Sequence, residues 1–138
     1  WHNEKFQALR SKGFPVKARW IDLDNESDFV LNQKDELWKQ CFEDVRDSDF
    51  VLLYCEDDSE EQRGALVEIG MAFGFDKPVY AVGACKTIKP NKISDVAFTH
   101  YERFHWLPTN DLTKGAMMAM EIERKKAQMI AELGLEVA

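Results

Sequence analysis

The sequence lacks a long apolar run. Its best candidate for a membrane span is interrupted by Glu68, Asp76 and Lys77, and no stretch of about 18 apolar residues remains. No signal peptide is visible either. We therefore expect a protein that has no membrane partner.

Positive charge is also in short supply. The chain carries 25 acidic and 18 basic residues, which gives a net charge of −7. Proteins that bind nucleic acids gather Lys and Arg on one surface, so this balance argues against a nucleic-acid partner. It fits a protein whose ligand is a small molecule, but the charge alone does not identify that ligand.

Cysteine is scarce and irregularly spaced. The three cysteines, Cys41, Cys55 and Cys85, do not form a disulfide framework, and no pair has the close spacing of a zinc site. We expect these thiols to be reduced and mostly buried in a reducing compartment, and we predict a cytoplasmic location.

What the sequence does contain is an alternation of helical and strand-like segments. A length of 138 residues suits a single domain, 1–138. Apolar residues recur at helical or strand-like spacing, or in continuous runs such as "FVLLYC" that are typical of a strand covered on both faces. These patterns predict helices at 2–12, 34–47, 64–75 and about 110–133, and strands at 15–21, 50–55, 78–83 and 100–107.

The order of these segments favours one fold class. Helices that alternate with strands indicate a parallel sheet flanked by helices, which is the doubly wound α/β class. The chain opens with a helix, and four strands are few for such a sheet. A first strand upstream of Trp1, missing from this sequence, would account for both features.

Ligands of such sheets bind beyond the carboxyl ends of the strands. Carboxylates and aromatic residues dominate these positions in the sequence, and Arg63 and Lys86 are the nearby cations. The residues that follow the predicted strands are Trp20, Asp22 and Asp24, then Glu56, Asp57 and Asp58, then Gly83, and finally His105 and Trp106.

Glu68 is the one charged residue in the otherwise apolar stretch "ALVEIGMAFGF". Neighbours on a helix lie three or four positions away, and here they are Gly64, Ala65, Met71 and Ala72, which cannot pair with a carboxylate. A buried carboxylate without a partner costs several kcal/mol or shifts its pKa upward. The surroundings of Glu68 therefore decide how this segment is understood.

Two outcomes are open for Glu68. It could pair with a group from elsewhere in the fold, such as Arg19, Arg63 or a backbone N–H. Alternatively, it could face a ligand cleft, because Gly64 lets the backbone approach a ligand closely and the nearby helix N-terminus favours an ionised carboxylate. In that position Glu68 would be suited to attack the anomeric carbon of a sugar.

Residues 47–83, "DSDFVLLYCEDDSEEQRGALVEIGMAFGFDKPVYAVG", resemble the nucleoside 2-deoxyribosyltransferase superfamily. The elements that carry the resemblance are Asp49 before the buried strand, the pattern G-x-x-x-E-x-G-x-A that begins at Gly64, and "FDKPVYAVG". The preceding "LRSKGFPVKARWID" is similar to the family's helix, glycine and strand, so the resemblance covers most of 5–83.

The resemblance implies a flavodoxin-like three-layer sandwich with a mainly parallel sheet. It implies that Glu68 attacks C1′ of a nucleoside or nucleotide, that the base leaves, and that water or a second base then takes the sugar. It assigns Asp49 to the leaving base or its proton, and the chemistry needs no metal or organic cofactor. As substrate-binding candidates we add Trp20, Asp22, Asp57, Asp58 and Gly64.

The sequence departs from the family pattern at Gln62, where the transferases often carry an aspartate that contacts the sugar. An alternative is therefore a nucleotide-binding or sensing module of the same fold, or an NAD glycohydrolase of the Toll/interleukin-receptor type. Family sites are completed across a subunit interface. Together with the apolar residues of the last helix, this predicts a homo-oligomer, a dimer or larger.

Two further features have competing interpretations. The acidic run 56–61 either is a solvated loop or binds Mg²⁺ or Ca²⁺ through its oxygen atoms. Trp20 and Trp106 either stack on a base or pack in the core.

Overall fold

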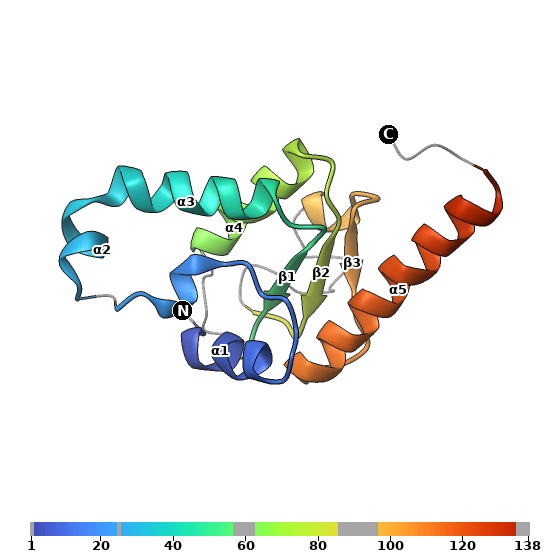
Figure 1. Cartoon of the computed structure of the whole chain (residues 1–138), viewed down its shortest axis with the longest axis horizontal. Helices are drawn as coiled ribbons and strands as arrows, with labels where there is room; N and C mark the ends of the chain where they lie inside the picture. The colour runs from blue at the N-terminus through green and yellow to red at the C-terminus, as the bar shows by residue number, and fades with distance from the viewer. Residues whose placement is uncertain (1, 25, 57–62, 86–96, 135–138) are drawn as a thin grey trace.

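The computed structural model of this chain describes residues 2–24, 26–56, 63–85 and 97–134. Its regular elements lie in a chain order that alternates helices with strands (Figure 1). They are α1 (Asn3–Ser11), η1 (Arg19–Asp22), α2 (Asp28–Asn32), α3 (Lys34–Arg46), β1 (Val51–Tyr54), α4 (Arg63–Gly74), β2 (Val79–Val82), η2 (Ala97–His100), β3 (Phe104–Trp106) and α5 (Leu112–Glu132).

The described strands form one parallel sheet in the order β1-β2-β3. Val51 of β1 is opposite Val79 of β2, which is opposite Phe104 of β3. Because the strands are parallel, the chain leaves β1, β2 and β3 at the same end of the sheet, the carboxyl end of the strands. A ligand of a parallel sheet is expected at this end.

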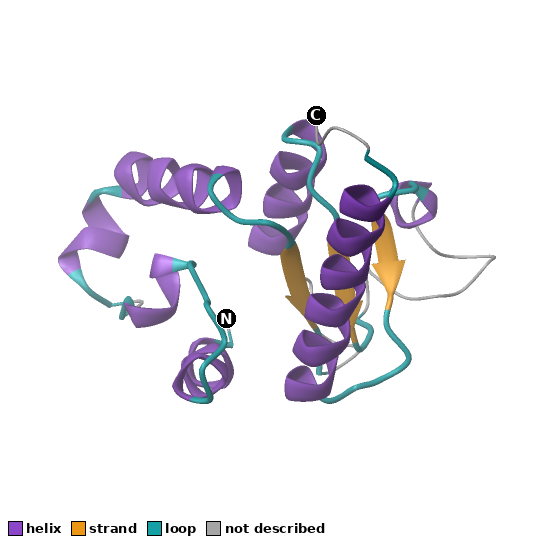
Figure 2. Cartoon of the chain, turned by 45° about the vertical axis from the view of Figure 1, so that its right-hand side comes forward, coloured by secondary structure: helices purple, strands orange, loops and turns teal. Residues whose placement is uncertain are grey.

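Helices cover both faces of the sheet, which gives three layers. In Figure 2, α5 lies in front of the strands, and the helices of the amino-terminal third lie to one side of them. Alternate side chains of the strands enter two separate hydrophobic clusters, as the pleat of a strand requires. One cluster, with α1 and α5, contains Phe6, Leu9, Ile21, Tyr54, Tyr80, Val82, Leu107, Leu112, Ala116 and Ala119. The other, with α3 and α4, contains Val45, Leu53, Cys55, Ile69, Ala72, Val79, Ala81, Cys85 and Phe104.

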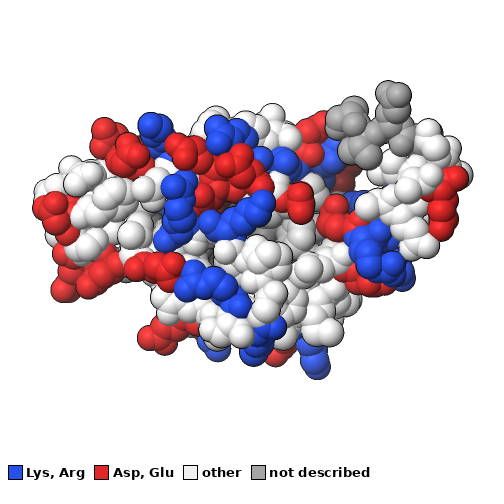
Figure 3. Space-filling model, viewed as in Figure 1, with Lys and Arg blue, Asp and Glu red and all other residues white. Residues whose placement is uncertain are grey.

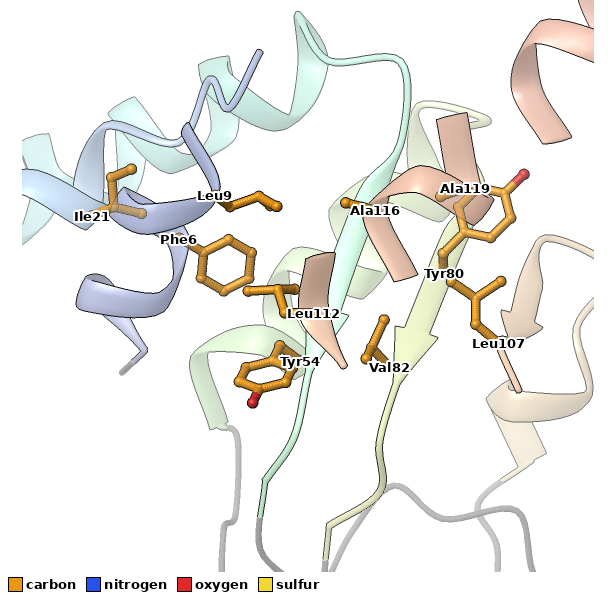
Figure 4. Packing of buried hydrophobic residues seen from close by; sticks show 10 residues of the cluster. All are labelled: Phe6, Leu9, Ile21, Tyr54, Tyr80, Val82, Leu107, Leu112, Ala116 and Ala119. Carbon is orange, nitrogen blue, oxygen red and sulfur yellow. The ribbon is translucent and has the colours of Figure 1, made fainter. Parts of the chain in front are cut away.

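The first of these clusters joins α1 to the rest of the molecule. Figure 4 shows Phe6 and Leu9 pointing from α1 toward Leu112 of α5 and toward β1. The rings of Phe6 and Tyr54 meet edge to face, with their centroids 6.5 Å apart. These contacts hold α1 beside the sheet without any backbone pairing between them.

The α/β class and the parallel, helix-flanked sheet are confirmed. The helices expected at 2–12, 34–47, 64–75 and 110–133 are present with small shifts of their ends. The cysteines are buried thiols, as predicted. The strand expected at 100–107 is shorter, because η2 and a turn occupy its first half and only Phe104–Trp106 pairs with β2.

The strand expected at 15–21 is wrong. Residues 19–22 form the 3₁₀ helix η1, and 14–18 pair with no strand of the described chain. Side chains at Phe14, Val16 and Ala18 nevertheless pack against the first cluster. The alternation in the sequence thus reports burial, while the hydrogen-bonded ladder that would define a strand has no partner.

One short helix was not foreseen in the sequence. Ser27 caps α2, because its hydroxyl accepts a hydrogen bond from the backbone N–H of Val30 at 3.3 Å. The sequence patterns predict no element between 22 and 33, whereas a serine before a short apolar stretch can start a helix.

Charged side chains are mixed on the surface of the molecule. On the face shown in Figure 3, Lys and Arg lie among Asp and Glu and form no continuous basic area. None of the helices in the described ranges has the length and apolar character that crossing a bilayer requires.

Gly83 allows the chain segments that follow β1 and β2 to lie close together at the carboxyl end of the sheet. Its φ is +76°, a left-handed value that favours glycine, and a Cβ built there would overlap the carbonyl oxygen of Cys55. The Cys55 backbone N–H in turn donates a hydrogen bond to Val82 O at 2.9 Å. A side chain at position 83 would therefore force the two strand ends apart.

We expect Gly83→Ala to lower the free energy of unfolding by about 3 kcal/mol, because it adds backbone strain and a clash with a main-chain atom. Denaturant unfolding measures this change. Gly70→Ala is the matched control, since a Cβ there meets nothing within 4 Å and alanine is the better helix former. Equal stability of the two variants would contradict the assigned role of Gly83.

Candidate functional site

Glu68 lies between two neighbouring cavities beside β1. One, the edge slot, has a volume of about 200 Å³ and runs along the free edge of β1. The other, the aromatic cavity, has a volume of about 340 Å³ and reaches the carboxyl end of β1. Glu68, Phe6, Trp20, Val51 and Leu52 line both cavities, so Glu68 is open to each of them.

The aromatic cavity has the position expected for a ligand. It is lined by Tyr54 at the carboxyl end of β1 and by Arg63 and Gly64 at the start of α4. Trp20 of η1 and Trp38 of α3 add large flat side chains. Flat aromatic rings beside a carboxylate can hold a planar ring of a ligand by stacking while the carboxylate meets its polar part.

The edge slot is lined mainly by apolar side chains, and several polar side chains lie together at one side of it. Residues of α1, α3 and α5 line it together with 14–18 and β1. Its polar side chains include Asp44, Ser48 and Asp49, which lie near the end of α3 and the amino end of β1. The two cavities therefore differ in chemistry, and Glu68 is at their junction.

Glu68 is a half-buried carboxylate that makes no hydrogen bond or ion pair with the described residues. Burial raises its pKa to about 7, and the nearby negative charge of Asp44 adds to the increase. Glu68 is in the second turn of α4, whereas the helix dipole acts mainly within the first turn, so the helix N-terminus offers this carboxylate less support than the sequence suggested.

Arg19, one of the partners considered for Glu68, is bound to α3 instead. Its backbone N–H and its Nε donate hydrogen bonds to the two carboxylate oxygens of Asp44, at 2.9 and 2.8 Å. A second guanidinium nitrogen is 3.3 Å from Glu43 Oε2. Arg19 therefore neutralises Asp44 and Glu43 in part, and Glu68 is left facing the cavities.

The side chain of Cys41 is also close to Glu68 and cannot balance its charge. Burial raises the pKa of the Cys41 thiol to about 12, and the charge of Glu68 is the second cause. The thiol is thus neutral at physiological pH. Of the two outcomes considered for Glu68, the structure shows the open cavity.

The structure brings together three of the residues expected at the site. Trp20 and Gly64 line the aromatic cavity with Glu68. Asp49 lines the edge slot but is exposed near the amino end of β1, at the opposite end from the aromatic cavity. It shares a cavity with Glu68 without reaching the carboxyl end of the sheet.

Asp22 has a different role from the one expected. It is exposed and forms a two-pronged ion pair with Arg10 of α1, with both N–O distances 2.8 Å. Hydrogen bonding to Arg10 lowers the pKa of Asp22. It lines neither of the two cavities. Asp57 and Asp58 lie outside the described residues.

Two residues of the site were missed in the sequence. Trp38 and Asp44 of α3 line the aromatic cavity and the edge slot respectively. Cys41 is three positions from each of them, so it neighbours both on the helix surface. Trp38 and Cys41 belong to the apolar residues at helical spacing that predict the helix at 34–47, and the carboxylate three positions after Cys41 was the available signal.

The structure offers no evident metal centre within the residues it describes. There, no three His, Cys, Asp or Glu side chains lie close enough together to hold a metal ion. Of the acidic run 56–61, only Glu56 is described; it accepts a hydrogen bond from the Tyr54 hydroxyl at 2.8 Å and lies 3.5 Å from Lys5 Nζ. The proposed cation site on this run is thus not tested by the structure.

Comparison of the chain with protein-family models, with curated proteins and with solved structures finds no significant match. The functional interpretation therefore depends on the geometry of this site and on the sequence pattern around Glu68.

The raised pKa of Glu68 predicts a specific dependence of stability on pH. A carboxyl that titrates near 7 when folded and near 4.5 when unfolded binds more protons in the folded state between these values. Its contribution to the free energy of unfolding is therefore lost as pH rises from 4.5 to 7. The loss amounts to as much as about 3 kcal/mol, at 1.36 kcal/mol for each pH unit.

Glu68→Gln should remove this loss. We expect the variant to gain stability relative to the unmodified chain as pH rises from about 4 to about 8, measured by denaturant unfolding. Glu102→Gln, at an exposed position, is the control and should show no such gain. A flat difference between Glu68→Gln and the unmodified chain across this range would contradict the raised pKa.

Proposed function

We propose that this protein cleaves or transfers the N-glycosidic bond of a nucleoside or nucleotide, with Glu68 as the nucleophile. The observation that carries the proposal is the carboxylate of Glu68, which has no partner among the described residues, beside an aromatic cavity at the carboxyl end of a parallel strand. The resemblance of 47–83 to the nucleoside 2-deoxyribosyltransferase superfamily supports the same assignment.

The reaction follows from the position of this carboxylate. An oxygen of Glu68 forms a bond to C1′ of the sugar, and the bond between C1′ and the base nitrogen breaks. The bonding electrons leave with the base, which takes up a proton. Water or the nitrogen of a second base then attacks C1′, displaces the Glu68 carboxylate and loses a proton.

The environment of Glu68 suits the charge changes in this reaction. In the transition state the sugar carries positive charge, and a carboxylate that is poorly solvated and unpaired interacts with that charge more strongly than a hydrated one. Arg19 is held by Asp44 and Glu43, so it does not compete for Glu68. The cost of burying Glu68 in the free protein is thus recovered when the sugar becomes positive.

The aromatic residues of the cavity suit the base. Trp20 and Trp38 present flat surfaces on the same cavity as Glu68, and stacking on such surfaces tolerates different bases. A Cβ on Gly64 would lie 3.8 Å from Trp38, an ordinary contact. Gly64 therefore lets the start of α4 approach Trp38 without being sterically obligatory there.

One observation favours a second candidate function. Asp49, the residue assigned to the leaving base, lies near the amino end of β1, away from the aromatic cavity. A site without an acid for the leaving base would still bind a nucleotide. The alternative is therefore a nucleotide-binding or sensing module of the same fold, or an NAD glycohydrolase of the Toll/interleukin-receptor type.

Assembly into a homo-oligomer is part of the proposal. The exposed side chains of α5 include Met117, Met120 and Met129, with 59, 40 and 60% of their surface accessible. Met120 also lines the edge slot, so a neighbouring copy that covered α5 would lie close to the site.

Base release from deoxynucleosides, deoxynucleotides and NAD, followed by chromatography, tests the enzyme. We expect release with at least one of these compounds and a rate that rises with pH through about 7, because Glu68 must be ionised to attack. Glu68→Gln and Glu68→Ala should lower the rate by a factor on the order of 10³ or more.

Glu102→Gln is the control for this experiment, since its exposed side chain should leave the rate unchanged. Base release that survives the loss of Glu68 would overturn the assignment of the nucleophile. Tight binding of one of the compounds without release, measured by calorimetry, would favour the sensing module.

A further inference from the structure

The proposed reaction needs a proton for the departing base, and Asp49 is badly placed to give it. Asp49 lies near the amino end of β1 and lines only the edge slot, whereas the base would lie in the aromatic cavity. A positioned acid that protonates the base speeds bond cleavage, because the base then leaves as a neutral molecule. The source of this proton therefore has to be sought among the residues of the aromatic cavity.

Few side chains of the aromatic cavity can give up a proton near neutral pH. Among the described residues of its lining, the ionisable ones are His2, Tyr54, Arg63 and Glu68. Glu68 is the nucleophile, and a guanidinium such as that of Arg63 does not lose its proton in proteins. The Tyr54 hydroxyl donates its hydrogen to Glu56 Oε1 at 2.8 Å. Because imidazole is the side chain that exchanges protons in the neutral range, His2 is the remaining candidate.

The start of α1 holds His2 in a fixed position beside the cavity. The carbonyl oxygen of His2 accepts a hydrogen bond from the backbone N–H of Phe6 at 3.1 Å. The amide nitrogen of Asn3 donates to Trp20 O at 3.3 Å and to Leu23 O at 3.1 Å. These bonds join the start of α1 to η1, so that His2 and Trp20 line the same cavity from two connected elements.

The charged groups around His2 include a carboxylate that suits an imidazolium. The ring of His2 contacts that of Tyr54 edge to face, with centroids 4.9 Å apart, and the Tyr54 hydroxyl is bonded to Glu56. This hydrogen bond, with Lys5 and His2 as further causes, lowers the pKa of Glu56, which therefore stays ionised. The negative charge of Glu56 favours a positive imidazole beside it, while Lys5 and Arg63 partly oppose this effect.

His2 and Glu68 occupy different parts of the aromatic cavity. Glu68 is at the junction with the edge slot, whereas His2 and Tyr54, the last residue of β1, line the aromatic cavity alone. A base that lies between them has its sugar toward Glu68 and its far side toward His2. In a purine, the basic nitrogen N7 is on that far side, across the five-membered ring from N9, the atom bonded to C1′.

On the basis of the proposed function, we propose that His2 is the acid of this site and protonates a departing purine base at N7. As an oxygen of Glu68 bonds to C1′, the bond between C1′ and N9 breaks and its electron pair stays on the base. The imidazolium of His2 gives its N–H proton to N7 and becomes neutral. When water or a second base then takes the sugar from Glu68, the proton that it loses restores the imidazolium.

Base release from 2′-deoxyguanosine and from 7-methyl-2′-deoxyguanosine tests this role of His2. The methyl group gives the second base a positive charge, so that base leaves as a neutral molecule without taking up a proton. We expect His2→Gln to slow release from 2′-deoxyguanosine at least about 100-fold and to change release from the 7-methyl compound less than about threefold. Spontaneous release, measured without protein, is subtracted from each rate.

Two further variants serve as controls. His100→Gln replaces an exposed histidine that lines neither cavity, and it should leave both rates unchanged. Glu68→Gln should stop release from both compounds, because both need the nucleophile. Release from the 7-methyl compound by His2→Gln also shows that this variant is folded and keeps its cavity.

The outcomes separate the acid from the proposed function. Equal losses with the two compounds in His2→Gln, or no loss with either, would overturn the role of His2 and leave that of Glu68 intact. Release by the unmodified chain from the 7-methyl compound but not from 2′-deoxyguanosine would also overturn it, because the site would then hold no acid. Release that depends on Glu68 from deoxynucleotides or NAD but from neither of these compounds would overturn the purine acid alone. No Glu68-dependent release from any of them would overturn the proposed function as well.

Discussion

The binding of Arg19 to Asp44 is the interaction on which both the site and the edge slot depend. Its two bonds, from the backbone N–H and from Nε, attach the end of 14–18 to α3 at a fixed distance from β1. The same bonds occupy the guanidinium that could have paired with Glu68. One interaction therefore both holds the wall of the slot and leaves the carboxylate of Glu68 exposed to the cavities.

The energetics of Glu68 follow from this arrangement. Glu68 is half-buried and has no partner among the described residues, so its pKa is raised, and the nearby charge of Asp44 raises it further. A surface glutamate would have cost nothing, so the position is unfavourable for stability alone. Such a group is useful where positive charge develops next to it, as on the sugar during cleavage of an N-glycosidic bond.

Much of the fold could be predicted because its patterns are local. Helical stripes identify α1, α3 and α5, and the continuous apolar runs identify β1 and β2. Glu68 could be singled out because its helix neighbours cannot pair with it. The prediction that it lies at a cavity or meets a distant partner needed only that local fact.

The rest of the site depends on contacts between segments that are distant in the sequence. Asp22 was expected near the ligand because it follows a strand-like pattern in the sequence. In the structure Arg10 of α1 binds it at the surface of the molecule. Trp38 belongs to the apolar pattern that predicts the helix at 34–47, and only the packing of α3 against α4 brings it to the aromatic cavity. No local signal distinguishes these outcomes.

The segment 14–18 shows why a correct pattern can give a wrong element. Alternating burial requires only a wall of apolar side chains on one side, and Phe14, Val16 and Ala18 find one in the first cluster. A strand also requires a hydrogen-bonded neighbour, and the edge of β1 is separated from this segment by the edge slot. The alternation in 14–18 thus reports the contact of Phe14, Val16 and Ala18 with the first cluster. Pairing within the sheet depends instead on the position of β1, which is distant in the sequence and which in the described residues pairs with β2.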